Sequence, residues 1–238
     1  MPVQLLSIII PAYNEQNRLP QTLERIAVYL HEQEFDSEVL VVDDGSTDET
    51  VKRAEQFVER MPGALRVLRN QGNRGKGYST RRGMLEAQGA WRLFTDADLS
   101  TPIEELDAFL KLARDGANVV IGSRALPQSQ VEVRQNWLRQ TMGRTFNKIL
   151  HALALRGIKD TQCGFKLFSA EAAQAIFSKA EVDGFAFDVE ALLLARKLGY
   201  AIIEQPVRWI NSPDSKVSIV RDSAKMLWDV LALRWRLR

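Results

Sequence analysis

Short apolar runs alternate with helix-like patterns along the first half of the chain. Residues 5–10 and 38–42 form continuous, largely apolar runs, which are typical of strands in a parallel sheet covered on both faces. Between them, residues 18–33 place apolar side chains at the spacing of an amphipathic helix. The alternation then predicts helices over 47–60, 75–88 and 102–114 and strands over 65–69, 91–95 and 118–121. Such alternating elements indicate a parallel α/β sheet.

The rhythm changes after Arg124. In the 102–114 helix just before it, Thr101 is the expected N-cap and Pro102 the first helical residue. The stretch 126–131 is the expected mobile loop. The remaining pattern predicts helices over 134–155, 170–180, 187–198 and 219–237, a loop and short strand over 160–168, and a strand over 200–205.

The amino-acid composition indicates the class of protein and its cellular location, but not its activity. The 238 residues are 45% apolar and 26% charged, as in soluble globular proteins, and a formal charge of +2 predicts no nucleic-acid partner. The single cysteine, Cys163, cannot form a disulfide within the chain, which favours a cytoplasmic location. We expect neither a signal peptide nor a membrane span, so any membrane association would be peripheral.

Polar residues gather where the predicted strands end. In open α/β sheets, ligands bind beyond the carboxyl ends of the strands. Here those positions hold residues 11–15, 43–46, 70–77 and 96–98. The sequence therefore predicts a ligand site built from these four loops.

Asp96 and Asp98 are separated by one residue at such a strand end. Two carboxylates this close repel one another unless a positive charge lies between them. Mg²⁺ or Mn²⁺, bound by carboxylates together with phosphate oxygens, meets that need and would act as a Lewis acid on a diphosphate leaving group. The alternative is a solvated acidic turn before the next helix.

Two further loops carry candidate nucleotide-binding groups. Asp43 and Asp44 precede a Gly-Ser turn. Capping the next helix needs only one polar group, so a carboxylate is left that could accept hydrogen bonds from a nucleobase or ribose. The alternative is that both residues serve only to form the turn. The segment 72–77 lacks P-loop spacing, but its backbone amides and Lys76 could bind phosphate. A plain flexible loop is the alternative there.

A basic series follows, at Arg124, Arg134, Arg139, Arg144 and Lys148. Its spacing distributes the later charges around the predicted helix, as on an ordinary solvated helix. Arg124 differs, because it follows a predicted strand end and therefore points toward the site. An arginine there can bind phosphate through two parallel hydrogen bonds. Cys163 has no histidine near it in the sequence, so we expect a packing residue rather than a nucleophile.

Several of these segments resemble the glycosyltransferases of family 2. Residues 7–15, 41–48 and 96–100 are similar, in order, to that family's nucleotide and metal motifs. The segments 122–124, 160–168 and 187–190 are similar to the polyprenyl-phosphate glycosyltransferases. Within that group, Thr-Gln-Cys-Gly-Phe-Lys and Phe-Asp-Val-Glu resemble the dolichyl-phosphate glucosyltransferases more than the mannose synthases.

The resemblance implies a fold and a donor. The fold would be a GT-A-like, Rossmann-type, mostly parallel α/β sheet flanked by helices, with a helical C-terminal extension on the acceptor side. One domain would span 1–238, with a nucleotide-binding half over 1–124 and an acceptor half over 125–238. The donor would be a nucleotide sugar, with UDP-glucose favoured and GDP-mannose second.

The resemblance also implies roles for individual residues. Asp96 and Asp98 would serve the metal and the diphosphate, while Arg124 and Arg139 would hold phosphate charge from donor or acceptor. The remaining nucleotide-binding positions would be Pro11, Tyr13, Glu15, Asp43, Asp44 and Lys76.

The expected reaction is a single displacement with inversion, in which a polyprenyl phosphate oxygen attacks the anomeric carbon. A phosphate monoester is already anionic near neutral pH, because its second pKa is about 6, so no general base is required. A soluble sugar or protein acceptor would require one, from Asp160, Asp188 or Glu190. A non-catalytic nucleotide-binding module is the third alternative, and the intact acid pair argues against it.

The C-terminal residues 219–238 suggest how such an enzyme would reach a lipid. Apolar side chains at helical spacing are joined by Trp228 and Trp235 and by Arg234, Arg236 and Arg238. This composition suits a helix that lies in the interface of an anionic membrane. The alternative is that the apolar stripe packs on the protein's own core.

Overall fold

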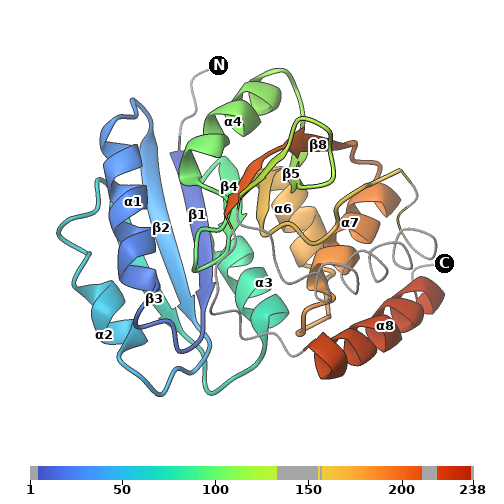
Figure 1. The fold of residues 1–238 in the computed structure, drawn as a ribbon, viewed down its shortest axis with the longest axis horizontal. Coiled ribbons are helices and arrows are strands. Elements are labelled where there is room, and N and C mark those ends of the chain that lie inside the picture. The colour runs from blue at the N-terminus through green and yellow to red at the C-terminus, as the bar shows by residue number, and fades with distance from the viewer. Residues whose placement is uncertain (1–4, 133–154, 156, 211–218, 237–238) are drawn as a thin grey trace.

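The computed structural model describes residues 5–132, 155, 157–210 and 219–236. Its elements, drawn in Figure 1, are β1 Leu5–Ala12, α1 Leu19–His31, β2 Asp36–Asp43, α2 Thr50–Glu55, β3 Ala64–Arg69, α3 Lys76–Glu86, β4 Trp91–Thr95, a 3-10 turn Ile103–Glu105, α4 Leu106–Arg114, β5 Val119–Ser123, β6 Gln130–Glu132, β7 Phe165–Ser169, α6 Ala170–Phe177, α7 Phe187–Lys197, β8 Ile202–Pro206, β9 Arg208–Ile210 and α8 Ile219–Arg236.

A seven-stranded sheet in the order β3-β2-β1-β4-β7-β5-β8 forms the centre of the molecule. β1 pairs in parallel with β2 and β4, β2 with β3, and β5 with β8. β7 runs antiparallel between β4 and β5. The predicted mostly parallel sheet flanked by helices is therefore confirmed, and the reversed β7 brings the second half of the chain into its middle.

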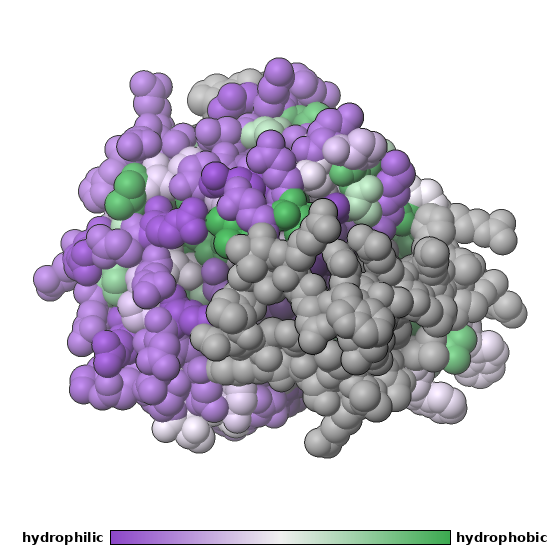
Figure 2. Space-filling model, in the orientation of Figure 1, coloured by the Kyte–Doolittle hydropathy of each residue, from purple (hydrophilic) through white to green (hydrophobic). Residues whose placement is uncertain are grey.

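Helices cover both faces of this sheet (Figure 1). Ile8 and Ile10 of β1 belong to the core under α1, α2 and α4, whereas Ile9 belongs to the core under α3, α6, α7 and α8. Since both faces are buried, the strand needs no polar alternation, which explains its continuous apolar run. The face seen in Figure 2 is accordingly hydrophilic over most of its described surface. Among the described helices, none is long and apolar enough to cross a bilayer.

Two local expectations about helix starts are wrong. The helix predicted over 47–60 is limited to α2, because Asp48 accepts a hydrogen bond from the backbone N–H of Thr50 and delays the helix, and turns follow Glu55. Thr101 does not cap the next helix. Its hydroxyl lies 3.7 Å from Cys163 Sγ, and a 3-10 turn separates it from α4.

The region after β5 also differs from the expectation. Part of the loop predicted over 126–131 enters a strand, because β6 pairs in parallel with β9. The helix predicted over 134–155 lies outside the described residues except for Leu155, which is not helical. Arg139, a predicted phosphate ligand, lies outside them too.

Candidate functional site

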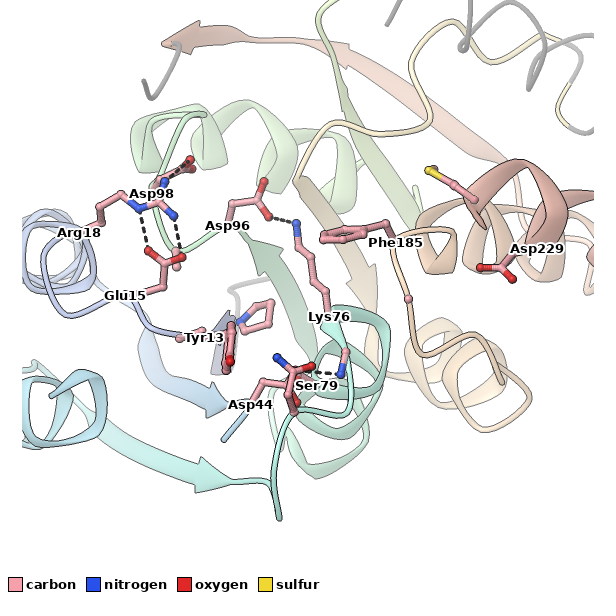
Figure 3. A pocket seen from close by; sticks show the side chains of 17 residues that line it. Tyr13, Glu15, Arg18, Asp44, Lys76, Ser79, Asp96, Asp98, Phe185 and Asp229 are labelled. Atoms are coloured by element: carbon pink, nitrogen blue, oxygen red, sulfur yellow. Dashed lines mark hydrogen bonds and ion pairs between the residues drawn. The ribbon is translucent and has the colours of Figure 1, made fainter. Parts of the chain in front are cut away.

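A cavity of about 450 Å³ opens at the carboxyl ends of β1, β2 and β4 (Figure 3). The four predicted strand-end loops all contribute to its wall or support it. The structure brings together seven of the predicted site residues in its lining: Pro11, Tyr13, Glu15, Asp44, Lys76, Asp96 and Asp98. Parallel strands place their carboxyl ends along one edge, which is why segments distant in the sequence converge there.

Two cations of the chain face the acid pair. The Lys76 ammonium lies 2.6 Å from Asp96 Oδ1, and the Arg18 guanidinium lies 3.6 Å from Asp98 Oδ2. Arg18 also forms a short ion pair with Glu15, at 2.6 Å, so it connects the β1 loop to the acid pair (Figure 3). The cavity therefore holds closely spaced charges of both signs.

The charges shift one another's protonation. Burial, followed by repulsion from Asp96, raises the pKa of Asp98. Burial alone would lower the pKa of Lys76, but the Asp96 carboxylate, with help from Asp188, raises it overall, so the lysine is protonated. Burial and the neighbouring Asp96 thus both make the negative charge on Asp98 costly, and a nearby positive charge would relieve that cost.

A divalent cation fits this donor set. Carboxylate oxygens are hard ligands of the kind that Mg²⁺ and Mn²⁺ prefer. Across the described residues, no group of three or more His, Cys, Asp or Glu side chains forms a metal site. A cation at Asp96 and Asp98 would therefore take its other ligands from water and from phosphate oxygens, as Mg²⁺ commonly does.

Asp44 organises the loop that carries Lys76. Its carboxylate accepts hydrogen bonds from the backbone N–H groups of Arg74 and Gly75, at 2.9 and 2.8 Å, and from the side chain of Asn70 at 2.9 Å. Gly75 has φ of 105°, and a Cβ there would lie 2.3 Å from the Asp183 carbonyl oxygen. Asp44 and this close approach to Asp183 thus anchor the loop at its entry to α3. Those two amides bind Asp44, so they are not presented to phosphate.

Asp43 and Arg124 lie outside the cavity lining. Both oxygens of Asp43 lie 3.3 Å from the Ser46 backbone nitrogen, so this residue shapes the turn instead of facing the cavity.

The Arg124 side chain binds the carboxylate of Asp160 through two hydrogen bonds of 2.7 and 2.9 Å. Burial alone would raise the pKa of Asp160, but Arg124 brings it down to about 2. Arg124 therefore fixes the segment that begins at Asp160.

That segment ends against the acid pair. The Gly164 carbonyl accepts a hydrogen bond from the backbone N–H of Asp96 at 3.2 Å, and a Cβ at Gly164 would lie 1.9 Å from Asp96 Oδ2. Only glycine leaves room for the Asp96 carboxylate in this position. Cys163 beside it is fully buried, and burial raises the pKa of its thiol to about 11, as expected of a packing residue.

A buried ion pair, Lys166–Asp188, lies close enough to Lys76 for the two pairs to interact. Lys166 Nζ lies 2.5 Å from Asp188 Oδ1 and donates to the Cys163 carbonyl at 2.6 Å. Burial raises the pKa of Asp188, while Lys166 opposes that rise. The ammonium groups of Lys76 and Lys166 lie 5.5 and 5.9 Å from the centre of the Phe94 ring. Both ammonium groups are thus within cation–π range of the same ring.

Some cavity residues were not anticipated from the sequence. Arg18 and Ser79 come from elements already placed at the site, and the Glu15–Arg18 spacing of three residues was the available signal for the former. Phe185 precedes α7, and Met226 and Asp229 lie on α8. No motif connects those three to the strand ends, because only the docking of distant segments brings them to the cavity.

The solved structures that resemble this one show the fold. A glucosyl-3-phosphoglycerate synthase from Mycobacterium tuberculosis in complex with UDP superposes with a TM-score of 0.70 at 19% identity, covering 98% of this chain and 80% of that one. Its complex with Mn²⁺, UDP and glucosyl-3-phosphoglycerate gives 0.71 at 20% identity, with the same coverage. The predicted GT-A-like architecture is confirmed.

Sequence relatives match over nearly the whole chain. A dolichyl-phosphate beta-glucosyltransferase of Dictyostelium discoideum is 38% identical over 242 residues, covering 97% of this chain and 74% of the relative. The Homo sapiens protein of the same name is 35% identical, covering 99% and 76%. The model of glycosyl transferase family 2 matches residues 7–177. With the acid pair at the strand end and the sheet that carries it, this chain is a glycosyltransferase and belongs to family 2.

Proposed function

We propose that the protein transfers glucose from UDP-glucose to a polyprenyl phosphate, in a single displacement with inversion that depends on Mg²⁺ or Mn²⁺. The names of the relatives support a glucose donor and a dolichyl-phosphate-like acceptor. The UDP and Mn²⁺ in the complexes of the structural neighbours support the nucleotide and the metal. GDP-mannose remains the second donor. The protein would act in the cytoplasm or peripherally on the cytoplasmic face of a membrane.

A phosphate acceptor is supported by the positions of the carboxylates that could have served as general bases. Asp160, Asp188 and Glu190 are held by Arg124, Lys166 and Arg236, and none of these three carboxylates lines the cavity. Glu190 also accepts hydrogen bonds from the backbone N–H groups of Glu181 and Val182. An acceptor that arrives already anionic, such as a phosphate monoester, needs no such base.

Without a general base, the main task of the site is to position the charged groups of donor and acceptor. In this proposal Pro11, Tyr13 and Glu15 contact the nucleoside, and Asp44 contacts the ribose or base while holding the Lys76 loop. A bound divalent metal at Asp96 and Asp98 supplies Lewis-acid stabilisation of the departing diphosphate. Lys76, which is protonated, neutralises phosphate charge beside them.

Two arginines complete the proposed roles. Arg139 holds phosphate charge, whereas Arg124, whose guanidinium binds Asp160 outside the cavity lining, positions the 160–164 segment. As the acceptor oxygen bonds to the anomeric carbon, the bond to the nucleoside diphosphate breaks and UDP leaves with the electron pair.

Asp229 supports a second candidate function, transfer to a hydroxyl acceptor. Asp229 on α8 lines the cavity, where it could act as general base toward a hydroxyl acceptor such as a soluble sugar. Asp229→Asn separates the two functions, because it removes the basic carboxylate and keeps the shape. Asp115→Asn, at the exposed residue that follows α4, is the matched control.

The test measures nucleotide release and glycolipid formation from UDP-glucose or GDP-mannose, with polyprenyl phosphate or soluble sugars as acceptors. We expect glucose transfer to polyprenyl phosphate, with less than about threefold change in Asp229→Asn, because no base is used. If transfer instead requires a hydroxyl acceptor and falls by about 10²–10⁴-fold in Asp229→Asn, the second candidate is correct.

A further inference from the structure

Helix α8 presents apolar side chains on two opposite sides. On the inner side, Met226, Val230 and Leu233 are buried, and the helix packs against α7. On the outer side, Trp228, Leu231 and Trp235 are 74%, 45% and 82% exposed. We call these three residues the outer stripe.

The outer stripe is one continuous feature. Its members are separated by three and four residues, so they share one face of the helix, and a turn of about 100° per residue places that face opposite the buried one. Figure 2 shows green and nearly white side chains at the edge of the molecule over α8, whereas most of the described surface is purple. Single exposed apolar residues are ordinary, but two tryptophans and a leucine in a row form a patch.

The same helix forms part of the cavity wall. Met226 and Asp229 line the cavity, and Asp229 lies on the side where Phe185 projects into it (Figure 3). Polar contacts help to hold the helix there: Gln162 Nε2 lies 3.2 Å from Met226 Sδ, and Arg236 pairs with Glu181 and Glu190. The outer stripe is therefore separated from the cavity by about one helix diameter, roughly 10 Å.

We propose that the outer stripe lies on an anionic lipid bilayer and so holds the cavity at the level of the lipid headgroups. The inference rests on the proposed polyprenyl phosphate acceptor, whose phosphate is presented at that level. Tryptophan prefers the membrane interface because its ring is apolar and its N–H is polar.

The charge of the C-terminal segment favours a lipid surface, rather than a second copy of the chain, as the partner of the outer stripe. Apart from Arg236, which pairs with Glu181 and Glu190, residues 219–238 contain four basic and two acidic residues. This excess of positive charge attracts anionic headgroups and repels an identical helix. A helix of this composition lies in the plane of the interface without crossing it.

The experiment is sedimentation of the full chain with phosphatidylcholine vesicles, with and without phosphatidylglycerol, in the absence of donor and acceptor. Trp228→Gln/Trp235→Gln removes the aromatic surface. Val28→Gln/Val58→Gln is the control, because these valines are 56% and 46% exposed elsewhere on the molecule. We expect the tryptophan variant to bind anionic vesicles at least about tenfold more weakly, and the control to bind like wild type.

A second readout ties the stripe to the acceptor. The tryptophan variant should lose activity on a long-chain polyprenyl phosphate in vesicles and keep it on a short, water-soluble prenyl phosphate. Unchanged thermal midpoints will verify that the variants fold, as expected for exposed positions.

Equal vesicle binding by wild type and the tryptophan variant overturns the proposal, as does a wild type that ignores anionic vesicles. A wild-type dimer that the variant converts to a monomer in size-exclusion chromatography would also overturn it, by making the stripe an interface between copies. Because vesicle binding needs no turnover, stripe-dependent binding without any glycolipid product would contradict the proposed function and leave the docking face supported.

Discussion

The position of Asp96 depends on the absence of a side chain at Gly164. The start of β7 meets the end of β4 here, and the two are joined by the hydrogen bond between Asp96 N–H and the Gly164 carbonyl. A glycine lets the backbone approach while the Asp96 carboxylate still turns toward Lys76. Residue size at one position thus controls the geometry of the proposed metal site.

Gly164→Ala should reduce turnover and leave the fold intact. The added methyl would overlap Asp96 Oδ2, which is the end of a flexible side chain and can rotate away. A displacement of about 1 Å in a catalytic group can reduce turnover by about 10²-fold, so we expect a fall of that order together with weaker Mn²⁺ activation. Steady-state kinetics over a Mn²⁺ titration and a thermal melt measure both effects.

Gly184→Ala is the matched control in the same cavity. A Cβ there meets nothing closer than Asp229 Oδ2 at 3.9 Å, so the substitution should have little effect. Equal kinetics for the Gly164→Ala and wild-type enzymes would show that the contact does not position Asp96.

At the scale of elements, β7 and α7 are connected by the buried Lys166–Asp188 pair. Lys166 is 1% exposed and Asp188 is 6% exposed, so either charge would be costly without its partner. Lys166 also binds the Cys163 carbonyl, just before Gly164. The pair therefore connects the helix, the reversed strand and the segment that contacts Asp96.

Lys166→Met should destabilise the protein by about 3–5 kcal/mol, because it leaves the Asp188 charge buried and unpaired. The double variant Lys166→Met/Asp188→Leu should recover most of that loss, because it removes both charges. The free energy of unfolding in urea gives the comparison. A double variant no more stable than the single one would contradict this explanation.

An exposed ion pair provides the control. Arg69 and Glu55 lie 2.7 Å apart with both side chains more than half exposed. Arg69→Met should change the free energy of unfolding by less than about 1 kcal/mol, because water already screens that pair.

At the scale of the whole molecule, ligand binding should raise the stability of the folded state. A ligand at 100 times its dissociation constant adds about 2.7 kcal/mol, and each kcal/mol shifts the melting midpoint of a chain this size by about 2–4 °C. We expect UDP with Mn²⁺ to raise the midpoint by about 5–10 °C and GDP to raise it less.

Asp98→Asn tests the metal in the same melt. It removes one negative charge and keeps the shape, so the part of the shift that depends on Mn²⁺ should disappear, whereas Asp115→Asn should behave like wild type. A larger shift with GDP would favour GDP-mannose as donor. A UDP shift unchanged by EDTA would contradict the metal assignment.

The sequence by itself determined the parallel part of the sheet and the strand-end loops that line the cavity. Apolar runs covered on both faces and helices between them specify a parallel α/β sheet, because burial on two sides removes the polar alternation. The loops after β1, β2 and β4 were predicted to share one site, and they do, because parallel strands end at a common edge. That prediction needs only local patterns and one general rule of topology.

The tertiary structure decided which of those residues face the cavity and what completes it. Asp44 lines the cavity and Asp43 shapes the turn, a difference set by packing around two adjacent carboxylates. Gly164 contacts Asp96 across 68 positions in the sequence, and α8 brings Met226 and Asp229 to a cavity whose other walls precede them by more than 40 residues. Such contacts depend on how whole elements pack, and local hydrophobic periodicity carries no information about packing between distant segments.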